Sequence, residues 1–101
     1  MTVEEATDEI KQLIEALLRE RFRDEIEFGP IVVTPHFDHD GEEYLRSYIV
    51  FQGDQKKLDP TWTLGLSRQL WPRAEELGYP GIPMQLFVEK SEWPALEEQL
   101  V

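Results

Sequence analysis

The amino-acid sequence predicts an α+β fold, a two-layer sandwich in which helices cover one face of a three-stranded sheet. Three observations predict it: an amphipathic pattern over residues 3–24, two strand-like segments joined by an Asp–Gly turn, and a further helix and strand after residue 59. The expected order is α-β-β-α(kinked)-β-α. Helices interleaved with strands in this way bury one sheet face beneath the helices. The 101 residues are expected to form a single domain.

The first helix is predicted over residues 3–24, because apolar side chains recur there at steps of three and four residues. Thr2 and Glu5 have the spacing of a capping box, in which hydroxyl and carboxylate satisfy free amides at the helix start. Acidic residues crowd the first turns and arginines lie near the end, an order that suits the helix dipole. The apolar stripe consists of Ile10, Leu13, Ile14, Leu17, Leu18 and Phe22.

A β-hairpin is predicted next, because residues 31–34 and 44–51 are rich in β-branched and aromatic side chains. Asp40-Gly41 is typical of a two-residue turn in which both positions need positive φ. This turn would place Phe37 opposite Tyr44. Because side chains alternate along a strand, the same register predicts an aromatic–arginine strip on one face, made of Phe37, Tyr44, Arg46 and Tyr48.

Asp59-Pro60 predicts the start of the second long helix, with Asp59 as N-cap and proline at the first helical position. Pro72 lies inside the helical pattern and is expected to kink or split the helix near Leu70-Trp71. Residues 84–90 are expected to form the third strand, and Ser91 to cap a short terminal helix. Two long helices can cover only one face of the sheet, so function is sought on the other face.

The composition excludes several classes of protein. The chain has no cysteine, which excludes a disulfide scaffold, a thiolate metal site and cysteine catalysis. No apolar run approaches the roughly 18 residues that a membrane span requires, and the first residues lack the pattern of a signal peptide. We therefore expect no membrane partner and a cytoplasmic location. The net charge of −11 disfavours nucleic acid as a partner, because cations supply most of the affinity for phosphates.

The hairpin tip is a candidate metal site. In the expected register Asp38 lies opposite Glu43, on the same face as His36, and His39 follows in the turn. A histidine and two carboxylates offer the mixed nitrogen and oxygen ligands that divalent metals accept. A solvated, acid-rich turn explains the same residues without a metal. Apart from this divalent metal, with a hydrolytic or regulatory role, the sequence predicts no cofactor.

The sequence assigns no catalytic residues. Ser47 is the only serine near His36 in the expected register, on the same face, but its flanking residues form no nucleophile elbow. The adjacent carboxylates Glu42 and Glu43 diverge on a strand and do not form an acid–base pair. A non-enzymatic function is therefore favoured.

The aromatic–arginine strip is a candidate protein-binding surface, because aromatic residues and arginine are enriched in interfaces. The alternative is that this strip forms the core beneath the helices. Whichever face the helices cover, one apolar face of the sheet is left without a helix on it, which favours a protein partner or a homodimer. The negative charge favours a basic partner, toward which the chain would act as an inhibitor or antitoxin. The expected acidic rim of the strip is Asp38, Asp40, Glu42 and Glu43.

Residues 34–45, with the sequence TPHFDHDGEEYL, resemble a family of small uncharacterised bacterial proteins, as do residues 48–54 and 58–63. This resemblance implies a bacterial, cytoplasmic protein and brings no catalytic or binding residues. The order of elements is also similar to KH-like folds such as ribosome-binding factor A, which implies an alternative role with RNA or the ribosome. The phosphate-clamping glycine loop of those proteins is replaced here by residues 70–73, and their basic surface is missing.

Overall fold

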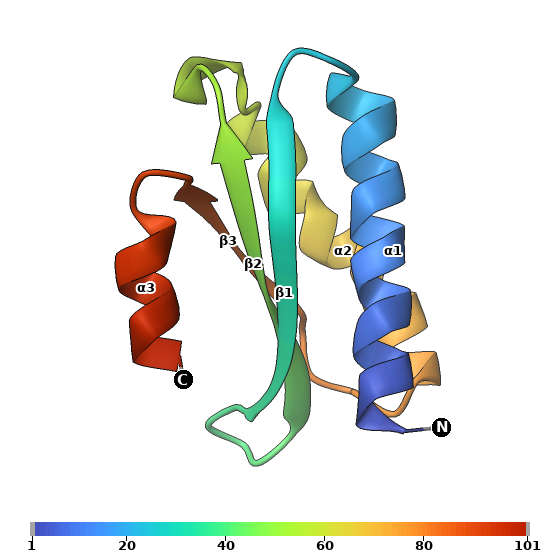
Figure 1. The fold of residues 1–101 in the computed structure, drawn as a ribbon. Helices are drawn as coiled ribbons and strands as arrows, with labels where there is room; N and C mark the ends of the chain where they lie inside the picture. The colour runs from blue at the N-terminus through green and yellow to red at the C-terminus, as the bar shows by residue number, and fades with distance from the viewer. Residues whose placement is uncertain (1, 101) are drawn as a thin grey trace.

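The computed structural model describes residues 2–100 and has the predicted α+β architecture (Figure 1). The sheet has the order β1-β2-β3, in which β1 pairs antiparallel with β2 and β3 pairs parallel with it. The elements are α1 (Val3–Phe22), β1 (Glu27–Phe37), β2 (Glu43–Gln52), a 3-10 turn (Gln55–Lys57), α2 (Pro60–Glu76), β3 (Met84–Glu89) and α3 (Trp93–Leu100).

The two long helices begin at the predicted caps. The Thr2 hydroxyl accepts a hydrogen bond from the Glu5 amide at 3.1 Å, and the Asp59 carboxylate accepts one from the Thr61 amide at 3.0 Å. α2 continues through Pro72 as one helix and is not split, because buried Leu70 and Ala74 on either side anchor it to the core. Within residues 2–100, no helix combines the length and the apolarity needed to cross a lipid bilayer.

The main core lies between the sheet and the two long helices. Figure 1 shows α1 and α2 on one side of the sheet, as predicted, and α3 on the opposite side. A second, smaller cluster lies under α3, where Trp93 packs with Tyr48, Val50 and Val88. The fully buried side chains of the main core include Ile10, Ile14, Leu18, Phe22, Leu45, Ile49, Leu66 and Leu70.

The hairpin turn differs from the predicted one by one residue. The Gly41 amide donates to the Asp38 carbonyl at 3.1 Å, and the Asp38 amide donates to the Glu42 carbonyl at 2.9 Å. Gly41 has a φ of 83°, whereas Asp40 does not have the positive φ that a two-residue turn needs. The predicted Asp40-Gly41 turn is therefore wrong, and Phe37 pairs with Glu43 instead of Tyr44.

This shift reverses the two faces of β1 relative to β2. His36 pairs with Tyr44, and Thr34 pairs with Arg46. Since paired residues point to the same side of a sheet, His36 and Thr34 lie on the α3 face. Phe37 alternates with His36 and lies on the opposite face. The side-chain alternation within β2 follows the prediction, because that strand's own pattern sets it.

Candidate functional site

The sheet face that carries α3 is only partly covered. α3 has eight residues, and its Trp93 and Leu96 pack near Tyr48. Toward the hairpin, β1 and β2 continue past the end of α3 (Figure 1), and strand pairing places side chains of all three strands on this face. We term these side chains the tyrosine–arginine patch: Thr34 and His36 of β1, Tyr44, Arg46 and Tyr48 of β2, and Met84 and Leu86 of β3.

Strand pairing places Arg46 at the centre of the patch. Arg46 pairs with Thr34 of β1 on one side and with Met84 of β3 on the other. Leu86 pairs with Tyr48 one step further along. Met84 is 45% exposed and Leu86 is 39% exposed, although both are large apolar side chains. The patch therefore joins a polar, aromatic centre, in which Tyr44 and Tyr48 are buried and Arg46 is half-buried, to an exposed apolar edge.

The guanidinium of Arg46 is held between two phenols. Its Nη2 donates to the Tyr44 hydroxyl at 2.6 Å, and its Nη1 donates to the Tyr48 hydroxyl at 3.5 Å. The guanidinium carbon lies 5.8 Å from the centre of the Tyr44 ring, within the range of a cation–π contact. The hydrogen bonds to Tyr48 and Tyr44 raise the pKa of Arg46 above its ordinary value. Arg46 therefore carries a permanent positive charge on this face.

His36 lies beside Tyr44 rather than beside the acidic residues of the hairpin tip. Its Nε2 shares a hydrogen bond with the Thr34 hydroxyl at 2.9 Å, and its ring centre lies 5.9 Å from that of Tyr44. Burial, and then the positive charge of Arg46, lower the pKa of His36 below its ordinary value. The imidazole is therefore neutral at pH 7, and Arg46 supplies the formal charge of the patch.

The expected metal ligands of the hairpin tip do not come together. The prediction required Asp38 opposite Glu43, but Phe37 occupies that position and His36 faces the other way. One oxygen of Asp38 accepts hydrogen bonds from the amides of Asp40 and Glu42, each at 2.9 Å, so it closes the turn. His39 is exposed at the tip. Across residues 2–100, no three His, Cys, Asp or Glu side chains are arranged to hold a metal ion.

The expected proximity of Ser47 and His36 is wrong for the same reason. Ser47 alternates with Arg46, so it points to the face beneath α1 and α2, where it is fully buried. Its hydroxyl has no hydrogen-bond partner among the residues described. His36 lies on the other face of the sheet, and the two side chains cannot act as a nucleophile and base.

The predicted aromatic–arginine strip divides between the two faces. Tyr44, Arg46 and Tyr48 share the α3 face, whereas Phe37 lies on the other side and is 72% exposed. Met84 and Leu86 belong to the patch but were missed, because only the parallel pairing of β2 with β3 brings them there. The four predicted rim residues Asp38, Asp40, Glu42 and Glu43 lie at the hairpin tip, next to the Tyr44 end of the patch.

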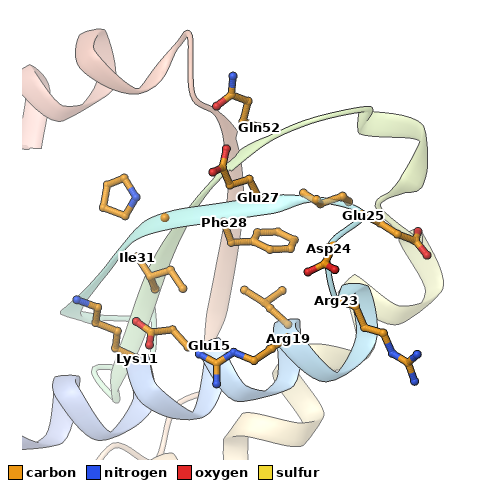
Figure 2. Close-up of a pocket in the computed structure, with 14 residues that line it drawn as sticks. Lys11, Glu15, Arg19, Arg23, Asp24, Glu25, Glu27, Phe28, Ile31 and Gln52 are labelled. Carbon is orange, nitrogen blue, oxygen red and sulfur yellow. The ribbon is translucent and has the colours of Figure 1, made fainter.

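Apart from the patch, a hollow lies between α1 and the start of β1 (Figure 2). It has a volume of about 740 Å³ and forms where pairing between β1 and β2 is interrupted between Phe28 and Ile31. Its lining combines three cationic side chains with four acidic ones, so charge does not select a ligand of either sign. These charged residues are Lys11, Arg19 and Arg23, and Glu15, Asp24, Glu25 and Glu27.

The tyrosine–arginine patch is thus the surface with the most distinctive chemistry: a cation fixed by two phenols, beside a neutral histidine and two exposed apolar side chains. Comparison of the chain with protein-family models, curated proteins and solved structures finds no match. The geometry of the patch is therefore the basis on which a function is inferred.

Proposed function

We propose that this chain is a non-enzymatic protein-binding module and that the tyrosine–arginine patch is its contact surface. The observation that carries the proposal is the exposure of Met84 and Leu86 directly beside Arg46 and Tyr48. Apolar, aromatic and arginine side chains in one patch are the composition of interface hot spots. Ile82, which is also exposed, lies two residues before Met84 in the connection that leads into β3.

The charge of the chain indicates the kind of partner. The net charge is −11, and four carboxylates at the hairpin tip lie next to the Tyr44 end of the patch. A partner with positive charge around its contact surface would be steered to this end of the molecule. The proposed role is that of an inhibitor or antitoxin that covers a basic protein in a bacterial cytoplasm.

The test is a capture experiment with a patch variant and a matched control. Met84→Gln with Leu86→Gln removes the apolar edge without adding charge, and Leu64→Gln makes the same change at an α2 residue that is 81% exposed. A protein from the native host should be retained equally by the wild type and Leu64→Gln, and at least about tenfold less by the patch variant. Quantitative mass spectrometry of the eluates gives the ratio.

Two results would contradict the proposal. One is that no host protein depends on the patch, so that all three baits retain the same set. The other is that the pure protein forms a dimer that the patch variant abolishes, as measured by analytical ultracentrifugation. That result would make a second copy of this chain, and not a different protein, the occupant of the patch.

A further inference from the structure

Hydrogen-bond donors of Arg46 outnumber the acceptors near it. A guanidinium has five N–H groups, and those of Arg46 make two hydrogen bonds, one to each phenol. The Nε of Arg46 is buried and has no hydrogen-bond partner among the residues described. Leaving a buried donor unpaired is costly. Arg46 as a whole is half-buried, and its two Nη atoms keep N–H groups that the bonds to the phenols do not use, so the acceptor left for these groups comes from outside the chain.

The neighbours of Arg46 are donors too. The Tyr44 and Tyr48 hydroxyls accept from Arg46, so each keeps its own hydrogen to donate. Within residues 2–100 no carboxylate forms an ion pair with Arg46, although the chain has 21 acidic residues. Arg21 and Arg73, in contrast, pair with acidic side chains of the chain itself.

We propose that Arg46, with Tyr44 and Tyr48, is a carboxylate-binding site that receives an acidic side chain of the partner protein. The inference rests on the proposed function, since it assigns a ligand to the centre of the same patch. A guanidinium binds a planar carboxylate through parallel N–H···O bonds. Because the phenols already hold the guanidinium, little side-chain freedom is lost on binding.

The charges around the site favour a carboxylate over a phosphate. Arg46 is the one formal positive charge of the patch, because neutral His36 adds none. A carboxylate carries a single negative charge that Arg46 balances. A phosphate brings up to two charges, and the second would be repelled by the acidic hairpin tip at the Tyr44 end. The partner is therefore a protein with one acidic residue inside a basic surface.

The test follows the Nε–Hε resonance of Arg46 in ¹H–¹⁵N spectra, assigned by its loss in Arg46→Lys. Sodium acetate is titrated against sodium chloride at matched ionic strength. A saturable shift of the Arg46 resonance with acetate alone is expected, and the resonances of carboxylate-paired Arg21 and Arg73 serve as internal controls. Tyr44→Phe removes one donor and should weaken acetate binding roughly two- to tenfold.

The carboxylate site is wrong if acetate and chloride shift the Arg46 resonance equally, or if inorganic phosphate saturates the shift and acetate does not. It is equally wrong if Tyr44→Phe binds acetate as the wild type does while its amide spectrum shows an unchanged fold. If the acetate titration contradicts the carboxylate site, the capture of a host protein through Met84 and Leu86 remains a separate prediction. If acetate binds but no host protein depends on the patch, the proposed function fails and the anion site remains.

Discussion

Replacing Phe22 by alanine is expected to lower the free energy of unfolding by about 3–5 kcal/mol. Phe22 is the last residue of α1 and is only 1% exposed. Its ring centre lies 5.4 Å from that of Phe28 and 5.2 Å from that of Trp62, so it joins α1 to β1 and α2. Truncation removes this apolar surface and leaves a cavity among three elements that cannot all close over it.

Urea unfolding followed by circular dichroism measures this loss. Phe22→Leu keeps most of the volume and should cost less than about 1.5 kcal/mol, which keeps the test usable if the alanine variant does not fold. Leu64→Ala truncates an exposed helical side chain and should change stability by less than about 0.5 kcal/mol. Equal stability of Phe22→Ala and Leu64→Ala would contradict the packing of α1 against α2 and the sheet.

Gly81→Ala is expected to cost about 1–3 kcal/mol and to disturb the tyrosine–arginine patch. A Cβ at Gly81 would lie 2.8 Å from the Cβ of Tyr44 and 3.1 Å from the carbonyl oxygen of Glu43. The Gly81 amide also donates to that carbonyl at 3.0 Å, so the two backbones cannot separate without losing a hydrogen bond. The added methyl group must therefore displace Tyr44, which holds Arg46.

Gly65→Ala provides the control for this variant. Gly65 lies within α2, and a Cβ there would meet nothing within 4 Å. Alanine is the better helix former, so Gly65→Ala should stabilise the chain by up to about 1 kcal/mol. Urea unfolding gives the change in the free energy of unfolding for both variants. The chemical shift of the Arg46 Nε–Hε resonance should change in Gly81→Ala and not in Gly65→Ala. If Gly81→Ala matches the wild type in both measurements, the close approach of residue 81 to Tyr44 is wrong.

The parts of the fold that depend on local signals could be predicted from the sequence. The caps at Thr2 and Asp59 each involve residues within one helical turn, and the apolar stripe of α1 repeats at steps of three and four residues. The β2 pattern correctly placed Tyr44, Arg46 and Tyr48 on one face, because alternation is a property of a single strand.

The candidate site could not be predicted fully, because it depends on pairing between strands. The side chain of Asp38 bonds two backbone amides and lengthens the turn, so that Gly41 alone needs positive φ. A shift of one residue then moves every β1 side chain to the other face. The shift places His36 beside Tyr44 and places Phe37 on the opposite face of the sheet. The contribution of Met84 required the parallel pairing of β3, which no local pattern specifies.

The pairing of β2 with β3 brings Met84 and Leu86 beside Arg46, and the alignment of β1 with β2 decides whether neutral His36 or Phe37 completes the patch beside Tyr44. Nuclear Overhauser contacts between assigned side chains measure this alignment directly. The expected result is a set of cross-peaks between the rings of His36 and Tyr44, and between Thr34 and Arg46. Cross-peaks between Phe37 and Tyr44 with none between His36 and Tyr44 would contradict it, and would return Phe37 to the patch in place of the histidine.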